Sequence, residues 1–138
     1  MPVCIFCQFA GHAAAAPVVF EDEVTLAFLD HRPLFPGHCL LIPKAHHETL
    51  MDLPEALIGP FFSRAKLLAQ ALEKALAAEG VFVAVNNRVS QSVPHLHLHL
   101  IPRRHKDGLK GFFWPRRPYR DEEEMRQVQA AIRKALGS

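Results

Sequence analysis

The stretch that decides the fold is Pro94–Pro102, which reads PHLHLHLIP. Successive side chains of an extended strand point to opposite faces, so this pattern separates three histidines from three leucines. Neighbouring histidines on one face then lie roughly 6.6 Å apart. Because the leucine face requires burial, the stretch predicts a strand that is half core and half site. One face carries His95, His97 and His99, and the other carries Leu96, Leu98 and Leu100.

Length and composition favour one domain. The chain has 138 residues, of which 49% are hydrophobic, and a formal charge of +2. That charge is too small to indicate a nucleic-acid partner by itself. The apolar runs are short and broken, and the N-terminus lacks the features of a signal peptide, so we expect no membrane span and a cytoplasmic location. Three cysteines in such a chain indicate metal binding or free thiols rather than disulfides.

Apolar and β-branched runs predict five strands. The histidine stretch is the last of them, and the polar segment 86–93 joins it to the fourth. The first two strands form a hairpin. The four strands that precede the histidine stretch are predicted at residues 18–20, 24–29, 38–43 and 81–85.

A long helical segment is predicted between the third and fourth strands. Asp52 is a suitable N-cap, Gly59-Pro60 should interrupt the helix, and the main helix then runs from Pro60 to about Glu79, with Gly80 closing it. Apolar residues at steps of three and four mark the face that packs on a sheet. These are Phe61, Ala65, Leu68, Leu72 and Leu76.

A second helix is predicted at the end of the chain. It begins at Asp121, whose spacing to Glu124 resembles a capping box, and Gly137 ends it. Its predicted buried stripe consists of Met125, Val128, Ile132 and Leu136.

Cys4-Ile5-Phe6-Cys7 places two thiols at the spacing that half of a tetrahedral zinc site commonly uses. A thioredoxin-like redox pair is the alternative, but such a pair usually follows a strand, and three residues are too few to form one. Two small buried cysteines are a further alternative. The other zinc ligands would have to come from far along the chain, and His46 and His95 are the candidates.

Residues 95–99 favour chemistry at phosphorus. A neutral imidazole held by a strand is a good nucleophile, and adjacent imidazoles can stabilise charge on phosphate oxygens. His97 has such neighbours on both sides and is the predicted nucleophile. A catalytic metal on the three histidines is disfavoured, because side chains roughly 6.6 Å apart along one strand converge poorly on one ion. A metal-binding histidine tract would lack the strict alternation.

Four polar positions are candidates to assist the histidines. His38 follows Gly37, which allows a ligand or backbone to come close, although a strand-end histidine is more often structural. Asp30, at the end of a strand, either forms a turn or binds a vicinal diol. Gln91 and Ser92 are candidates to orient a histidine or donate to a leaving oxygen, with loop solvation as the alternative.

Beyond Pro102 the chain becomes basic and aromatic, so we divide the predicted domain (1–138) into a core (1–102) and an extension (103–138). Interleaved cations and rings, including Trp114, can hold phosphates and stack a base. A solvated rim over an apolar contact with a partner subunit is at least as well supported. A nucleic-acid surface is the alternative that we do not favour.

These motifs resemble the histidine triad superfamily of nucleotide hydrolases and transferases. The resemblance rests on Gln91–His99, which reads QSVPHLHLH, and on Pro36–Lys44, which reads PGHCLLIPK, and it runs from Cys4 to about Pro102. It implies an α+β fold with a five-stranded antiparallel sheet and one long helix. It also implies a homodimer in which two sheets form one sheet of ten strands.

The resemblance implies a role for each site residue. His97 would attack the α-phosphorus of a nucleotide, and water would hydrolyse the nucleotidyl-histidine intermediate. Relatives that begin with Cys-x-x-Cys bind a structural zinc, which would give His95 only an indirect part in the chemistry. The other implied roles are His38, His95 and His99 in support of His97, Gln91 and Ser92 near the bridging and leaving atoms, Asp30 on the ribose hydroxyls, and Cys4, Cys7, His46 and His95 on zinc.

Two features depart from the family pattern. Many bacterial relatives carry a glycine-rich loop before the glutamine, whereas Arg88-Val89-Ser90 is shorter and has no glycine. We therefore expect Arg88 to contact the phosphate through its side chain, and Asn86, two residues before it, is a further candidate for substrate binding. The third histidine, His99, stands where the uridylyltransferase branch typically has glutamine, which favours hydrolysis.

The predicted protein is a zinc-containing, cytoplasmic, homodimeric hydrolase. It would cleave nucleoside polyphosphates or nucleoside phosphoramidates at the α-phosphorus, and the basic extension favours a dinucleoside polyphosphate such as diadenosine tetraphosphate. A nucleotidyl transferase or phosphorylase is the alternative among enzymes. A nucleotide-binding scaffold with little turnover is the alternative from another class.

Overall fold

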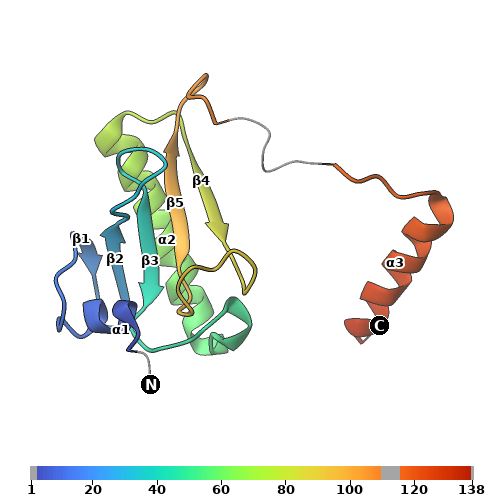
Figure 1. Cartoon of the computed structure of the whole chain (residues 1–138), viewed down its shortest axis with the longest axis horizontal. Helices are drawn as coiled ribbons and strands as arrows, with labels where there is room; N and C mark the ends of the chain where they lie inside the picture. Colours follow the sequence, from blue (N-terminus) through green and yellow to red (C-terminus); the bar gives the residue numbers. More distant parts are fainter. Residues whose placement is uncertain (1–2, 110–115, 138) are drawn as a thin grey trace. The chain divides into compact units, whose positions relative to one another are not determined.

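The computed structural model describes residues 3–109 and 116–137, so Trp114 lies outside the described residues. The chain divides into two compact units, the first ending at Asp107 and the second beginning at Gly108. Helix α3 (Glu122–Ala135) belongs to the second unit (Figure 1). The first unit contains, in order, α1 (Ile5–Ala10), β1 (Val18–Glu21), β2 (Thr25–Leu29), β3 (Cys39–Pro43), the 3-10 helix η1 (Leu50–Asp52), α2 (Glu55–Leu76), β4 (Gly80–Val85) and β5 (Leu98–Arg103).

The five strands form one antiparallel sheet in the order β1-β2-β3-β5-β4. The predicted α+β fold, the hairpin and the pairing of the last two strands are therefore confirmed. Strands β1 and β4 are the sheet edges. The ten-stranded sheet of a dimer stays a prediction, as does the division of one domain at residue 102.

Each face of the sheet buries its own apolar cluster. Helix α2 lies along one face (Figure 1), where Phe61, Ala65 and Leu68 pack against Leu98 and Leu100. The short helix α1 covers the other face through Phe6. The residues beneath Phe6 are Leu26 and Phe28 of β2 and Leu40 and Ile42 of β3. Burying a large apolar side chain stabilises the fold by about 1.5–3 kcal/mol, so these two clusters fix which face each strand residue takes.

The strand predicted from His95 begins only at Leu98. Residues 92–95 bend, and the N–H of His95 donates to the carbonyl of Val93 at 2.8 Å. The N–H of Leu96 donates to the carbonyl of His47 in a loop, at 2.7 Å, and not to a neighbouring strand. The alternation nevertheless holds, since all three leucines are 0% exposed on the α2 side of the sheet. The histidines between them therefore face away from α2.

Helix α1 is not among the predicted elements. Its N-cap is Cys4, whose sulfur accepts a hydrogen bond from the backbone N–H of Cys7 at 3.4 Å. At its other end the N–H of Gly11 donates to the carbonyl of Cys7 at 2.9 Å. The Cys-x-x-Cys motif therefore lies on the first turn of a helix.

The predicted interruption of α2 at Gly59-Pro60 is wrong, because the helix continues through both residues. A proline normally clashes with the Cβ atom of the residue before it. Gly59 has no Cβ, so this clash with the Pro60 ring is absent and both residues can stay helical. The buried ring of Phe61 then anchors this turn on the sheet.

Both predicted ends of α2 are also wrong. Asp52 belongs to η1, where its carboxylate accepts hydrogen bonds from the backbone N–H and hydroxyl of Thr49, and Pro54 is the N-cap. The helix ends at Leu76, four residues before Gly80, because Ala77 takes the left-handed conformation and its N–H bonds to Glu73. Four of the five predicted stripe residues are buried, and Leu76 is exposed.

Helix α3 begins as predicted, with the Asp121 side chain accepting a hydrogen bond from the N–H of Glu124 at 2.8 Å. Gly137 follows it with a φ of 88°. The predicted burial of its stripe is wrong for this single chain, since α3 buries none of its described residues. The exposed stripe is Met125, Val128, Ile132 and Leu136. Within residues 3–109 and 116–137, no helix has the length and apolar composition to cross a membrane.

The left-handed residue that ends α2 yields a stability test. Ala77 has a φ of 51°, a conformation in which its Cβ atom is crowded. We expect Ala77→Gly to raise the free energy of unfolding by about 1 kcal/mol. Ala75→Gly, inside the last turn, should lower it by about 1 kcal/mol. Urea unfolding of both variants checks this, and destabilisation by both would contradict the assigned helix end.

Candidate active site and metal centre

A backbone hydrogen bond defines the tautomer of His97. Its Nδ1 lies 2.8 Å from the carbonyl oxygen of His95. A carbonyl oxygen only accepts, so Nδ1 carries a hydrogen and Nε2 of the neutral ring carries the free electron pair. The ring is 4% exposed and lines a cavity. His97 therefore presents the nitrogen that a nucleophile requires.

His99 has the opposite tautomer. The N–H of Leu34 donates to Nδ1 of His38 at 3.1 Å, so His38 carries its hydrogen on Nε2. That nitrogen lies 2.9 Å from Nδ1 of His99, which must accept. The remaining hydrogen of His99 is then on Nε2, available to donate to an anionic ligand. His38 thus acts on the cavity through His99.

Burial keeps both of these rings neutral. Burial, followed by repulsion from His97 and His38, lowers the pKa of His99 to about 4. Burial also lowers the pKa of His38, against the opposing effect of Asp30, whose carboxylate lies 3.7 Å away. Near pH 7 the chain from Leu34 through His38 to His99 therefore holds one fixed set of hydrogens.

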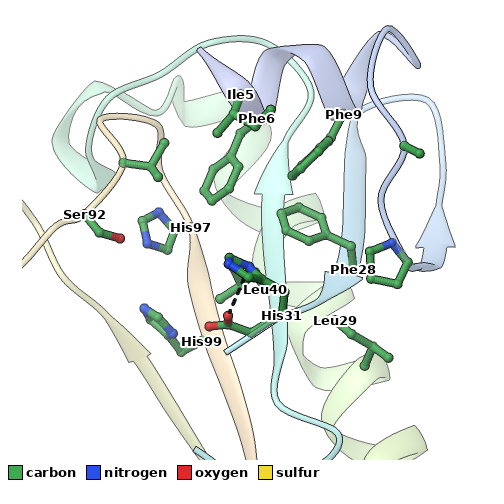
Figure 2. A pocket seen from close by; sticks show the side chains of 14 residues that line it. Ile5, Phe6, Phe9, Phe28, Leu29, His31, Leu40, Ser92, His97 and His99 are labelled. Atoms are coloured by element: carbon green, nitrogen blue, oxygen red, sulfur yellow. Dashed lines mark ion pairs between the residues drawn. The ribbon is translucent and has the colours of Figure 1, made fainter. Parts of the chain in front are cut away.

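A cavity of about 380 Å³ lies over the α1 side of the sheet. Its size is in the range of small-molecule sites. Figure 2 shows His97 and His99 along one side of it and the rings of Phe6, Phe9 and Phe28 along the other. Most of the lining is apolar, with polar groups converging at one end. Ile5, Leu29, Leu40, Asp30, His31 and Ser92 also line the cavity.

The sheet register explains the cavity floor. Phe28 of β2 is paired with Leu40 of β3, and Leu40 is paired with His99 of β5. Residues that are paired across antiparallel strands share one face, so the three side chains lie in a row. His99, Leu40 and Phe28 are thus parts of one cross-strand line at the cavity.

Sequence reasoning missed the aromatic wall. The ring centroid of Phe6 lies 5.2 Å from that of His97 and 5.3 Å from that of Phe28, edge to face in both cases. Phe9 lies 5.1 Å from Phe28. The spacing of Phe6 and Phe9 by three residues was the available signal, but it indicates a helix face only once α1 is known.

Two predicted polar contacts, Asp30 and Ser92, line the cavity. The first oxygen of Asp30 accepts the N–H of Arg32 at 2.9 Å, so this carboxylate is fixed by its own turn. It also lies 4.0 Å from the exposed His31, the contact marked in Figure 2. Asp30 therefore forms a turn and also places its carboxylate at the cavity, so its interpretation as a turn former is compatible with its interpretation as a ligand for a vicinal diol.

The 86–91 segment contributes mainly to the scaffold. Gln91 accepts the N–H of Arg88 at 2.8 Å through its side-chain oxygen, and its amide donates to the carbonyl of Glu48 at 2.6 Å. Arg88 has a φ of 72°, so the segment turns without glycine. Among the described residues that line the cavity, Asn86, Arg88 and Gln91 do not occur. Their roles at the substrate stay predictions.

Four side chains from three separate parts of the sequence meet beside the cavity. One ligand atom from each of Cys4, Cys7, His46 and His95 lies within 4.8 Å of all the others. Nδ1 of His95 is 3.4 Å from the sulfur of Cys4 and 3.5 Å from that of Cys7, and Nδ1 of His46 is 3.3 Å from Cys7. Two thiols and two imidazoles are a donor set that tetrahedral zinc prefers.

The chemistry of the donors also fits a cation. Nε2 of His95 donates to the carbonyl of Pro43 at 2.8 Å, which leaves the electron pair on the Nδ1 that faces the thiols. Burial lowers the pKa of His95 to about 4, so the ring is neutral. Without a cation, burial and the adjacent Cys4 raise the pKa of Cys7 to about 11. A bound cation would instead favour the thiolate.

Hydrogen bonds between two loops bring His46 to His95. The segment 47–50, which follows His46, is bonded to residues 87–96, so the two ligands belong to one hydrogen-bonded unit. The bonds run from Leu50 N–H to the Asn87 side-chain oxygen (2.8 Å), from the Gln91 amide to Glu48 carbonyl (2.6 Å), and from Leu96 N–H to His47 carbonyl (2.7 Å).

A family model described as the HIT domain matches residues 12–106. The chain belongs to the HIT domain family. This confirms the resemblance that the histidine stretch and the Pro36–Lys44 segment carry. A solved HIT family protein from Bacillus subtilis shares the fold, with a TM-score of 0.86 and 32% identity over 99% of each chain.

Three relatives of this HIT-domain chain illustrate the range of the family. Adenylylsulfatase HINT3 from Arabidopsis thaliana is 32% identical over 138 residues, covering 98% of this chain and 70% of that protein. Adenosine 5′-monophosphoramidase HNT1 from Saccharomyces cerevisiae is 38% identical over 109 residues, covering 77% and 66%. The crystal structure of a Zn-bound histidine triad family protein from Mycobacterium smegmatis has a TM-score of 0.73 and 36% identity, covering 97% and 96%. The family thus includes nucleotide hydrolases and a zinc-bound member.

Proposed function

We propose that the protein hydrolyses nucleotides at the α-phosphorus through a covalent adduct on His97. The observation that supports this most directly is the hydrogen bond from Nδ1 of His97 to the His95 carbonyl, which leaves Nε2 unprotonated at the cavity. His99 would donate its Nε2 hydrogen to a non-bridging phosphate oxygen. The apolar part of the cavity would hold the nucleoside.

The reaction would have two steps. Nε2 of His97 attacks phosphorus, an N–P bond forms, and the bond to the leaving group breaks, with its electron pair going to the leaving atom, which then takes a proton from solvent. Water next attacks phosphorus, the N–P bond breaks, its electrons return to Nε2, and one water proton is released. The Nδ1–H bond to the His95 carbonyl stabilises the positive charge that the ring carries in the adduct.

The relatives favour an adenylyl group as the part that His97 retains. One is an adenylylsulfatase and another is an adenosine 5′-monophosphoramidase. Each name describes the cleavage of a bond between adenosine monophosphate and a leaving group. We propose the same class of substrate here, including phosphoramidates and dinucleoside polyphosphates such as diadenosine tetraphosphate. Asp30, at the cavity, would bind the ribose hydroxyls, and the Ser92 hydroxyl would donate a hydrogen bond to the leaving atom.

Trapping the adduct tests this function. After acid quench of the protein with diadenosine tetraphosphate labelled in its adenosine, we expect label on the wild-type chain and none on His97→Ala. Turnover of His97→Ala should fall on the order of a thousandfold or more, because the nucleophile is gone.

The matched control is His105→Ala, an exposed histidine paired with Glu79, which should keep both adduct and turnover. Tight nucleotide binding without adduct or product would instead favour a binding scaffold. Nucleoside diphosphate formed on addition of inorganic phosphate would favour a phosphorylase.

We also propose that Cys4, Cys7, His46 and His95 hold a structural zinc ion, on the strength of their proximity and of the His95 tautomer. The ion would join the N-terminal helix to the two loops that carry the histidines. With two thiolates and two neutral imidazoles, all four positions around zinc would be filled by protein.

Metal analysis of a thiol variant tests the zinc site. Cys4→Ser should lower the zinc content from about one ion per chain to a small fraction of that and lower the melting temperature, because one thiolate ligand is lost. Cys39→Ala, which removes a buried thiol outside the cluster, should keep the zinc. Unchanged zinc content and melting temperature in Cys4→Ser would refute the site.

A further inference from the structure

Helix α1 lies between the Cys/His cluster and the cavity. Its N-cap Cys4 and its residue Cys7 belong to the cluster, while Ile5, Phe6 and Phe9 line the cavity. One six-residue helix thus supplies two metal-ligand candidates and the apolar wall of the proposed nucleoside site. A displacement of α1 would alter both sites at once.

Phe6 is the side chain that connects the two sites. It stands between the two cysteines in the sequence and is 6% exposed. Its ring centroid is 5.9 Å from that of His95, a member of the cluster, and 5.2 Å from that of His97, the proposed nucleophile. It is also 5.3 Å from Phe28, which lines the cavity. The position of this ring therefore defines the shape of the cavity next to His97.

The contacts that join the first turn of α1 to the Cys/His cluster are weak without a cation. A helix of six residues has little stability of its own. The ring of Phe6 packs on the sheet, but at the cluster the sulfur atoms and imidazole nitrogens meet only at 3.3–3.5 Å, in hydrogen bonds that involve sulfur and are weak. A cation bound by all four groups would tie the first turn of α1 to the loop of His46 and to the segment before β5.

The Cys/His cluster and the cavity also have lining residues in common. A second depression is lined by Cys4 and His46 of the cluster. It has Ile5, Ser92 and Val93 in common with the cavity. Ile5, Ser92 and Val93 therefore border both the depression at the cluster and the cavity where a ligand would lie.

We propose that the cluster locks α1 as the wall of the nucleoside cavity, so that metal binding and nucleoside binding strengthen each other through Phe6. The identity of the ligand rests on the proposed function, whereas the coupling rests on the position of α1. By thermodynamic linkage, a cation that raises the affinity for nucleoside must have its own affinity raised by the same factor. Zinc would then adjust substrate binding although it touches no substrate.

Titration calorimetry with adenosine 5′-monophosphate tests the coupling on the full-length chain. Zinc-loaded, zinc-stripped and zinc-restored protein are compared. We expect stripping to weaken binding on the order of tenfold and restoration to recover it. Adenosine, which has no phosphate, should show the same difference, because the wall contacts the nucleoside and not the phosphate.

Two further measurements test whether the coupling between zinc binding and nucleoside binding passes through Phe6 and α1. Phe6→Ala should keep its zinc but lose the difference between the loaded and stripped forms, while Phe62→Ala, which alters an exposed ring on α2, should keep the difference. Amide hydrogen exchange should accelerate in residues 4–10 on stripping and stay unchanged in β3 and β5.

The outcomes separate this inference from the proposed function. Equal affinity for adenosine monophosphate in loaded and stripped protein overturns the coupling and leaves the hydrolase intact. Absence of binding by both forms overturns both. A difference that survives in Phe6→Ala, or exchange that accelerates equally in α1 and in the central strands, also overturns the coupling.

Discussion

The hydrogen bond between Nδ1 of His97 and the carbonyl of His95 is the interaction on which the site depends. It fixes one ring in the tautomer that exposes an electron pair, and it uses a backbone atom of a residue whose own side chain belongs to the Cys/His cluster. The neighbouring ring of His99 receives the opposite tautomer from His38. Two identical side chains, two residues apart, are thereby given opposite chemical characters by their hydrogen-bond partners.

This arrangement is stable because the other face of the same segment is core. Leu96, Leu98 and Leu100 are fully buried against the side of the sheet that α2 covers, so rotation of the segment would expose them. The histidines consequently reach the opposite side, where α1 and the aromatic residues close over them. A single alternating pattern thus serves stability with one face and chemistry with the other.

The features that local sequence determines were predictable. The alternation of the histidine stretch, the hairpin and the cap at Asp121 depend on residues adjacent in the chain. The residues made Cys4, Cys7, His46 and His95 candidates for one zinc site, but the spacing left other interpretations open, and the family resemblance implied the full set. Helix α1 and the wall formed by Phe6 and Phe28 were not predictable, because they depend on docking of a short helix onto the sheet. The helix α2 continues through Pro60, where the preceding Gly59 has no Cβ atom to clash with the proline ring.

The tautomers of the two histidines are the most direct test of the central claim. Long-range proton–nitrogen NMR spectra of protein labelled with ¹⁵N-histidine, assigned with the variants His97→Gln and His99→Gln, distinguish the protonated from the unprotonated nitrogen of each ring. At pH 7 we expect His97 to carry its hydrogen on Nδ1 and His99 to carry its hydrogen on Nε2. The same tautomer on both rings, or a hydrogen on Nε2 of His97, would contradict the assignment of His97 as the nucleophile.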